Sequence, residues 1–375
     1  MTRADLLPST IVAEDVERIC DRISDALGAM SGRRLLISGG AGFLGYYLVS
    51  TVVAWNRNVP DREAVELTVW DNFARGVPPW LEAVRAERHV TVEERDITQP
   101  IPADAVELDY VVHAAGIASP TFYRRFPIET IDANVTGLRV LLDYCRARAE
   151  RGREVTGVLF FSSSEIYGDP PSDAIPTAED YRGNVSCTGP RACYDESKRF
   201  GETLCVNFAR SHGVPVTIVR PFNNYGPGLR IDDERVIPDF ARDILDRRDL
   251  VLLSDGSPTR TFCYVADAVC GYYAALTGGR RGEAYNVGVP EPEISIADLA
   301  ERMAEIGRDL FSYQGRVVRR ESADPDYLTD NPSRRCPDIG KARRELAYTP
   351  EVPLDEGLRR SLVWYSDAYG SGTRR

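Results

Sequence analysis

Tyr194 and Lys198 are the two residues whose types and spacing most directly allow chemistry. Residues four apart in a helix share a face, so this pair would place a phenol beside an ammonium group. A free tyrosine titrates near pH ~10, and only neighbouring positive charge makes it a proton acceptor at neutral pH. The pair therefore indicates a base that could oxidise an alcohol, although the same spacing also occurs on solvated helices without any function.

A strand, a glycine turn and a helix occur in that order near the beginning of the chain. Residues 33–38 form a short apolar run, Gly40-x-Gly42-x-x-Gly45 follows, and a helix is expected through residues 46–53. This arrangement brings a backbone turn and a helix N-terminus to a pyrophosphate. Asp71 ends the next expected strand, where it would bind ribose hydroxyls and repel a 2'-phosphate. We therefore expect NAD as cofactor, with Arg75 the one nearby residue that would favour NADP.

Further apolar runs predict an α/β fold. They lie at residues 66–70, 110–113, 158–161 and 216–219 and alternate with helical stretches, which is typical of a doubly wound parallel sheet of the Rossmann type. The spacing between the glycine turn and Asp71 exceeds the usual ~20 residues, so we expect an insertion at residues 56–63. The punctuation by proline and glycine over residues 221–228 predicts the start of a smaller mixed α/β substrate lobe.

The expected domain division has three parts. Residues 1–31 would be a helical extension, because Val12, Val16, Ile19, Ile23 and Leu27 recur at helical spacing. Residues 32–221 and 258–283 would form the NAD-binding domain, and residues 222–257 and 284–368 the substrate lobe. The extension would pack on the domain surface or on a partner subunit.

Composition narrows the class of protein. The chain has 375 residues, 43% of them hydrophobic, a net charge of -11, eight cysteines and three histidines. No apolar stretch approaches the ~18 residues of a membrane span, and no basic patch suggests nucleic acid. The cysteines form no C-x-x-C motif, so neither disulfides nor a metal site are expected. The N-terminus lacks the basic start and apolar core of a signal peptide, which indicates a cytoplasmic protein.

Longer motifs resemble one known family. They are Gly39-Gly-Ala-Gly-Phe-Leu-Gly45, Asp71-Asn-Phe73, His113-Ala-Ala115, Ser162-Ser-Ser-Glu-Ile-Tyr-Gly-Asp-Pro170, Gly189-Pro-Arg-Ala-Cys-Tyr-Asp-Glu-Ser-Lys-Arg199, Arg220-Pro-Phe-Asn223, Thr259-Arg-Thr-Phe262 and Arg335-Cys-Pro-Asp-Ile339. Over residues 33–368 the chain resembles the extended short-chain dehydrogenase/reductase enzymes that act on nucleotide sugars, and within them the UDP-glucuronate decarboxylases. The glycine turn and the Tyr/Lys pair mark the superfamily alone, whereas the motifs around Glu165 and Tyr194 are more specific to the decarboxylase branch.

The resemblance implies a set of site residues and a reaction. UDP-glucuronate would be oxidised at C4 with NAD, decarboxylated, and reduced to UDP-xylose, or released as a 4-keto pentose. The implied catalytic residues are Ser163, Glu165, Tyr194 and Lys198. Those implied to bind the UDP-sugar are Ser164, Asn223, Arg235, Arg260 and Arg335. Those implied to bind NAD are Gly39, Gly42, Phe43, Leu44, Gly45, Asp71, Asn72, Asp96, Ile97 and Ala114, together with Tyr194 and Lys198.

Glu165 would position the sugar or assist proton delivery to C5, and Ser164 with Arg260 would hold the carboxylate. Ser164 speaks against one alternative, because related 4,6-dehydratases carry an aspartic acid there and a serine is too weak an acid to protonate a departing hydroxyl. A UDP-sugar 4-epimerase stays open, as does a nicotinamide-binding protein without turnover.

Some positions depart from the family pattern. Leu253, Cys336 and Asp132 replace an aromatic residue and two lysines, so the sugar itself or the product ratio could differ. His113 would line the cofactor pocket or serve only as a core residue. In this family the helices near residues 134–150 and 194–211 would form a homodimer interface, though their apolar faces could equally belong to the chain's own core.

Overall fold

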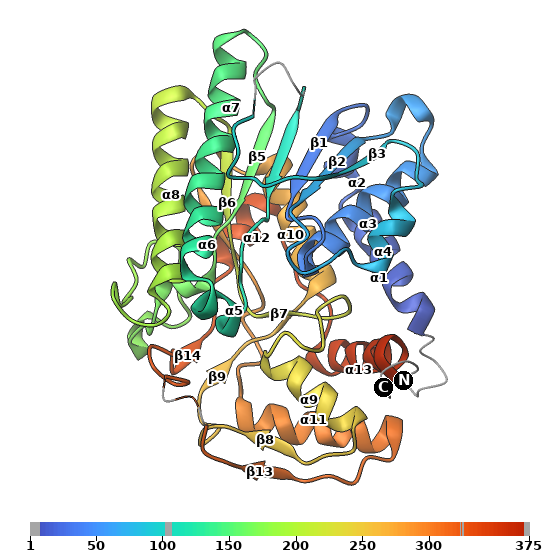
Figure 1. Cartoon of the computed structure of the whole chain (residues 1–375), viewed down its shortest axis with the longest axis vertical. Helices are drawn as coiled ribbons and strands as arrows, with labels where there is room; N and C mark the ends of the chain where they lie inside the picture. Colours follow the sequence, from blue (N-terminus) through green and yellow to red (C-terminus); the bar gives the residue numbers. More distant parts are fainter. Residues whose placement is uncertain (1–7, 102–106, 323, 325, 371–375) are drawn as a thin grey trace.

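A seven-stranded parallel sheet forms the centre of the molecule, shown in Figure 1. The computed structural model describes residues 8–101, 107–322, 324 and 326–370. The strand order is β11-β6-β5-β4-β1-β2-β3, and it reverses between β1 and β4, where doubly wound sheets bind ligands. The strands are β1 (Arg34–Ser38), β2 (Glu66–Asp71), β3 (Val90–Glu94), β4 (Tyr110–His113), β5 (Gly157–Phe161), β6 (Val216–Pro221) and β11 (Ala284–Val287).

Helices cover both faces of this sheet, which is why its strands are continuous apolar runs. In β5, Leu159 and Phe161 belong to the hydrophobic core shared with α3 and α10, whereas Val158 and Phe160 belong to the core shared with α7 and α8. Successive side chains of a strand point to opposite faces, so one strand serves both cores. The covering helices are α3 (Phe43–Asn58), α4 (Pro79–Val84) and α10 (Val265–Gly278) on one face and α7 (Leu138–Glu150) and α8 (Ala192–His212) on the other.

The expected doubly wound fold is confirmed, and two strands were missed. β3 is an edge strand whose residues are all half-buried or exposed, so its sequence lacks a strong apolar run. β11 has only four residues and pairs with β6, although residue 284 was expected to begin the substrate lobe. The expected insertion before Asp71 is present, because α3 continues to Asn58 and a short helix, η2 (Asp61–Glu63), precedes β2.

The N-terminal extension is built into the fold. The single helix expected over residues 10–30 is two helices, α1 (Pro8–Arg22) and α2 (Ser24–Ala29), which meet at Ile23. Ile11 and Ile19 are fully buried, and α1 packs against α3, α10 and α13. Residues 1–7 of the extension lie outside the described part of the chain.

Some of the remaining elements form the smaller part at the bottom of Figure 1, and others pack on the helices and strands of the main sheet. Three small sheets have the orders β10-β7, β12-β9-β14 and β13-β8. No helix in the described ranges has the length and apolar character needed to cross a membrane. The elements are α5 (Pro120–Arg125), α6 (Pro127–Ile131), η3 (Asp132–Gly137), η4 (Ser164–Tyr167), η5 (Ser172–Ala174), β7 (Asn224–Tyr225), α9 (Val236–Leu245), β8 (Leu250–Leu252), β9 (Thr259–Arg260), β10 (Cys263–Tyr264), β12 (Ile294–Ser295), α11 (Ile296–Phe311), β13 (Val317–Arg319), β14 (Arg334–Arg335), α12 (Gly340–Leu346) and α13 (Leu354–Gly370).

Candidate active site

The glycine turn between β1 and α3, called the cradle below, leaves no room for a side chain at Gly39 or Gly45. A Cβ at Gly39 would lie 2.5 Å from the backbone of Ala115, and one at Gly45 would lie 2.3 Å from the carbonyl oxygen of Gly40. Gly39 also has φ +75°, which favours glycine. Gly42 is the N-cap of α3, so Phe43 and Leu44 begin a helix whose first N–H groups lack intrahelical partners. A dinucleotide pyrophosphate fits this close backbone.

Asp71, at the carboxyl end of β2, contacts the same turn. Its carboxylate accepts hydrogen bonds from the N–H of Ala41 at 3.0 Å and of Phe73 at 2.9 Å. Burial raises the pKa of Asp71, and these two backbone hydrogen bonds oppose that rise. Arg75, which could have accepted a 2'-phosphate, forms an ion pair with Asp233 at 3.0 Å. The charges therefore fit NAD rather than NADP.

The other residues expected to hold the cofactor lie after neighbouring strands. Asn72 accepts a hydrogen bond from the Ala74 N–H at 3.1 Å, and Asp96 accepts one from the Thr98 N–H at 2.9 Å. Ile97 packs closely against Gly137, where a Cβ would lie 2.7 Å from its side chain. Ala114 follows β4, and its N–H donates to Ser38. The carboxyl ends of parallel strands share one edge, so these residues surround the glycine turn.

Ser163, Tyr194 and Lys198 converge where β5 ends and α8 begins. Ser163 caps η4, and its hydroxyl accepts a hydrogen bond from the Glu165 N–H at 3.2 Å. Lys198 Nζ donates to the carbonyl oxygen of Phe161 at 2.7 Å and lies 5.7 Å from the centre of the Tyr194 ring. The side chains of Ser163 and Tyr194 are also hydrogen-bonded to each other. The helix places the phenol, the ammonium group and the hydroxyl together, as an acid–base site requires.

Burial opposes the charged forms of both members of the Tyr/Lys pair. It raises the pKa of Tyr194 to about 12, although the hydrogen bond with Ser163 and the charge of Arg235 lower it. It lowers the pKa of Lys198 to about 7. A further positive charge beside the phenol would favour its ionised form, because opposite charges stabilise each other.

Glu165 lies between two arginines from distant parts of the chain. Its Oε2 atom accepts hydrogen bonds from Arg191 and, at 2.5 Å, from Arg335. Burial alone would raise the pKa of Glu165, but the charges of Arg191, Arg335 and Arg260 outweigh burial and lower it to about 2. Glu165 is therefore ionised at neutral pH in the free protein.

Arg260 occupies the same region but has different partners. Its Nη1 and Nη2 atoms donate to the carbonyl oxygens of Thr259, Pro332 and Ser333 and to the side chain of Asn331, at 2.6 to 3.3 Å. Burial and the charges of Arg335 and Arg191 lower its pKa to about 9. The guanidinium therefore anchors the segment that leads into β14, and β14 carries Arg335 beside Arg260.

The remaining residues expected to bind substrate surround these groups. Ser164 is buried in the first turn of η4. Asn223 donates to the Thr261 carbonyl at 2.8 Å, and its Oδ1 lies 3.4 Å from Arg335 Nη1. Arg235 is the N-cap of α9 and forms an ion pair with Asp233 at 3.0 Å.

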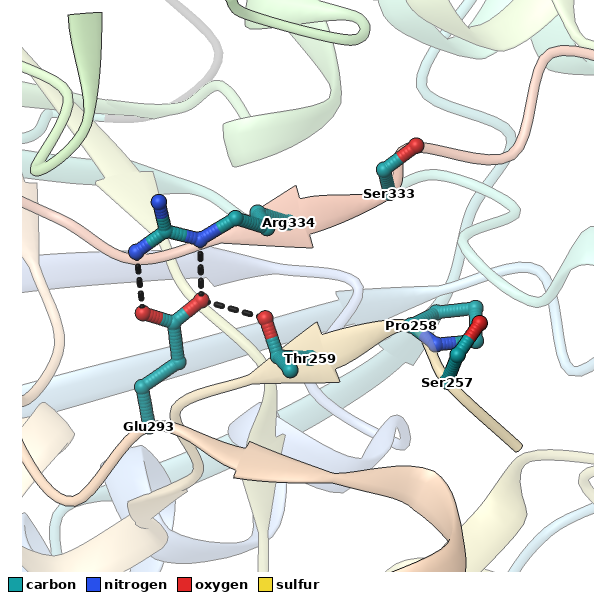
Figure 2. Close-up of a pocket in the computed structure, with 6 residues that line it drawn as sticks. All are labelled: Ser257, Pro258, Thr259, Glu293, Ser333 and Arg334. Carbon is teal, nitrogen blue, oxygen red and sulfur yellow. Dashed lines mark hydrogen bonds and ion pairs between the residues drawn. The ribbon is translucent and has the colours of Figure 1, made fainter. Parts of the chain in front are cut away.

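The three-stranded sheet β12-β9-β14 lies between this site and a pocket on the other face of the sheet, shown in Figure 2. Side chains alternate along a strand, so Thr259 and Arg334 point away from Arg260 and Arg335. Glu293 binds Arg334 through both carboxylate oxygens, at 2.9 and 2.6 Å, and accepts a hydrogen bond from Thr259. These residues line a pocket of about 490 Å³.

Sequence reasoning did not single out three buried residues at the site. Arg191 binds Glu165, and Tyr123 stacks on Tyr194 with ring centres 5.0 Å apart. Asn134 lies on the π-helix η3 and donates to Ser197 at 2.9 Å, and its Oδ1 lacks a partner within the described residues. A Cβ at Gly116 would lie 2.8 Å from Asn134 Oδ1 and 3.6 Å from Lys198 Nζ. The sequence offered one signal, and it was for Arg191. This arginine lies three residues before Tyr194, so it shares a helix face with Tyr194 and Lys198.

The sequence is similar to those of known proteins. Residues 35–288 match the model of the NAD dependent epimerase/dehydratase family. UDP-glucuronic acid decarboxylase 5 of Arabidopsis thaliana is 37% identical over 328 residues, which are 88% of each chain. UDP-glucuronic acid decarboxylase 1 of Xenopus tropicalis is 34% identical over 333 residues, which are 89% of this chain and 72% of that one.

A solved structure of a related enzyme has a similar fold. The dTDP-glucose 4,6-dehydratase DesIV of Streptomyces venezuelae, crystallised with NAD, superimposes with a TM-score of 0.75 at 27% identity, covering 90% of this chain and 98% of that one. The glycine cradle and Asp71 supply the matching cofactor site. The chain belongs to the NAD-dependent epimerase/dehydratase family.

Proposed function

We propose that this protein decarboxylates UDP-glucuronate to UDP-xylose. The observation that supports this best is the Ser163, Tyr194 and Lys198 site with a group of arginines beside it. Arg191 and Arg260 are buried, the side chain of Arg335 is 10% exposed, and the charges of all three lower the pKa of Glu165. The excess positive charge suits a substrate with a carboxylate and a diphosphate. The names of the relatives from Arabidopsis thaliana and Xenopus tropicalis point to the same reaction.

The residues divide the chemistry between them. Bound NAD would supply the hydride acceptor for C4 of the sugar and later return the hydride. Tyr194 takes the proton of the 4-hydroxyl, while Lys198 stabilises the phenolate. The C6 carboxylate is then β to a ketone, so carbon dioxide can leave while Tyr194 and Ser163 donate hydrogen bonds to the enolate oxygen. A solvent proton then adds to C5, and Tyr194 returns its proton to the C4 oxygen when C4 is reduced, which gives UDP-xylose.

Glu165 and Ser164 define which reaction follows. Because Glu165 is ionised and held by Arg191 and Arg335, we assign it to positioning the sugar and these arginines rather than to proton delivery. Ser164 cannot act as the acid that a 4,6-dehydration would need at neutral pH. Asn223, Arg235, Arg260 and Arg335 would contact the sugar or diphosphate.

One experiment tests the reaction directly. Purified protein is incubated with UDP-glucuronate and NAD, and proton NMR follows the sugar while absorbance follows reduced cofactor. UDP-xylose without accumulating reduced cofactor is the expected result. A UDP-4-keto pentose with reduced cofactor would show that the hydride is not returned, and UDP-galacturonate would indicate a 4-epimerase.

The Tyr194→Phe substitution tests the proposed base. It removes the ionisable hydroxyl and keeps the ring that stacks on Tyr123. We expect turnover to fall by about 1,000-fold or more, with NAD affinity within about twofold of wild type. Turnover close to wild type would remove Tyr194 from the mechanism.

We also propose a homodimer formed through α6, α7 and α8. These helices lie on the flank of the sheet away from the smaller lobe in Figure 1. Ile128 and Phe200 are 63% and 50% exposed, and Phe126 and Ile131 are also exposed, which is costly for a solvated surface. Light scattering after size exclusion tests this, and Phe200→Glu should convert a dimer to a monomer.

The division into domains and the location complete the proposal. We place the cofactor domain over residues 32–221 and 258–287, so that β11 is included, and the substrate lobe over residues 222–257 and 288–368. A cytoplasmic location is favoured by the eight cysteines, all of which are free thiols.

A further inference from the structure

The N-terminal helix α1 carries a carboxylate that contacts three other elements. Asp15 is fully buried. Its Oδ2 accepts hydrogen bonds from the hydroxyls of Tyr47 at 2.8 Å and Tyr264 at 2.6 Å, and its Oδ1 from Arg360 Nη2 at 2.9 Å. Burial raises the pKa of Asp15, while Arg360 and the two phenols oppose that rise. A buried charge is tolerated only when it is paired and hydrogen-bonded in this way.

Each hydrogen-bond partner of Asp15 lies on an element that is next to a different group of proposed binding residues. Tyr47 lies on α3, one turn beyond Phe43, where the cofactor cradle ends. Tyr264 belongs to β10, which pairs with β7 immediately after Asn223. Arg360 lies on α13, which packs against α9, and Arg235 is the N-cap of α9.

A second set of contacts holds the C-terminal end of α1. Arg22 forms an ion pair with the buried Asp267 of α10 at 2.6 Å. Asp267 also accepts a hydrogen bond from the Val352 N–H at 2.8 Å, two residues before α13 begins. The middle and the C-terminal end of α1 are therefore bonded to elements of the cofactor domain and of the smaller lobe.

We propose that Asp15 is a positioning residue that sets the distance between the cofactor cradle and the residues that bind the nucleotide sugar. The inference rests on the proposed function, because it takes the UDP-sugar to lie between the cradle and Asn223 and Arg235. Asp15 touches neither ligand and acts through Tyr47, Tyr264 and Arg360. The extension outside the motif-bearing region thus becomes part of the binding machinery.

The Asp15→Asn substitution tests this role, because the amide keeps the volume but presents N–H groups to Arg360. We expect the Kd for UDP and the KM for UDP-glucuronate to rise by about tenfold, since small displacements of binding groups are costly. All residues proposed to bind the cofactor lie in the cofactor domain, so the Kd for NADH should stay within about twofold of wild type. A substitution that affects only global stability would leave both affinities unchanged well below the melting temperature.

Two further variants make the test decisive. Glu14→Gln is the matched control, because Glu14 binds the same Arg360 at 3.1 Å but is half exposed, and its UDP affinity should equal wild type. Tyr264→Phe removes one hydrogen bond to Asp15 and should raise the Kd for UDP by about threefold. It also decides the question if Asp15→Asn fails to fold.

The outcomes separate this inference from the proposed reaction. UDP affinity within twofold of wild type in both folded variants would overturn the role of Asp15, and if only Tyr264→Phe folds, its value alone decides. A wild-type protein that binds UDP but leaves UDP-glucuronate intact would refute the decarboxylation and leave the comparison of UDP affinities valid. Equal loss of UDP and NADH binding would show that the substitution distorts the cofactor cradle as much as the UDP-binding residues, and would also overturn the role.

Discussion

The two faces of the small sheet β12-β9-β14 carry arginines in opposite electrostatic settings. On the outer face, Arg334 is neutralised by both oxygens of Glu293 and is partly exposed to solvent (Figure 2). On the inner face, Arg260 and Arg335 are neighbours in register, and with Arg191 they surround the carboxylate of Glu165. The outer pair is balanced within the sheet, whereas the inner group retains positive charge. A retained buried charge is costly to folding, so it indicates a place where an anionic ligand completes the balance.

A second acidic side chain, Asp195, contacts this group of arginines. It lies in the first turn of α8 with its Oδ2 3.8 Å from Arg191 Nε. Burial and the charge of Glu165 raise the pKa of Asp195, which favours its protonated form. The inner arginines therefore share the charge of Glu165, whereas Arg334 has both oxygens of Glu293 to itself.

The adjacent residues Arg334 and Arg335 give the sharpest test of this contrast. Arg335→Ala should lower kcat/KM for UDP-glucuronate by about 100-fold or more, because it removes a buried donor that would contact substrate and leaves Glu165 with one arginine fewer. Arg334→Ala should change kcat/KM by less than about threefold, since its ion pair is partly solvated. Measuring kcat/KM of both variants at the same ionic strength compares the inner and outer faces of the sheet. Similar losses in the two variants would mean that the faces do not differ in function.

The sequence predicted the groups that lie close together in the chain better than those that meet across it. Gly39 to Gly45 and the Tyr194/Lys198 pair are local patterns whose geometry follows from one turn or one helix. The pairing of Glu165 with Arg335 joins residues 170 positions apart, so no spacing rule could show it. Arg260 could be named as a residue, but its anchoring of the carbonyls at 332 and 333 depends on tertiary structure.

The missed strands have a related cause. β3 and β11 are the two edge strands of the sheet, and the polar Asn286 interrupts the short apolar run of β11, so neither has the apolar run of a central strand. The role of α1 was also beyond the sequence, because nothing local distinguishes Asp15 from the neighbouring acids Glu14 and Glu17. Its burial becomes clear only when α3 and α13 are packed around it.

Glu165→Gln would remove the one strong negative charge on the inner face. The variant should unfold about 3 kcal/mol more easily, because Arg191 and Arg335 would lose their shared counter-charge. Adding UDP should raise the Tm of the variant more than that of wild type, because ligand phosphates would then supply the missing charge. Thermal unfolding with and without UDP measures both effects. An unchanged Tm would show that the arginines need no counter-charge.

The same variant has a predictable pH dependence. The folded-state pKa of Glu165 is lowered to about 2 from 4.5, so its ionised form contributes stability that is fully present above pH 4.5. That contribution is lost as pH falls from 4.5 toward 2. The Tm difference between wild type and Glu165→Gln should therefore shrink over this interval, and the outer-face variant Glu293→Gln, whose carboxylate is less buried, should show a smaller change.

Lys198 extends the comparison to a cation whose hydrogen bond goes to a carbonyl oxygen instead of an acid. No ion pair joins it to an acidic side chain within the residues that the structure describes, and burial lowers its pKa from 10.5 to about 7. Lys198→Met should abolish turnover yet stabilise the fold by roughly 2 kcal/mol at pH 7, because the desolvation of the ammonium group disappears. Arg334→Met should have the opposite sign, a loss of under about 1 kcal/mol, because Arg334 has a bidentate partner.

The stability difference between wild type and Lys198→Met should depend on pH. Below pH 7 both the folded and unfolded states of wild type are protonated, so the cost of burial is complete. Between pH 7 and 10.5 the unfolded state binds more protons, so wild-type stability rises with pH and the advantage of Lys198→Met declines. Denaturant unfolding of both proteins across this range measures the difference. A difference that stays constant, or a less stable Lys198→Met, would show that Lys198 is not an uncompensated charge, and the contrast between the site and the outer face of the sheet would then rest on the arginines alone.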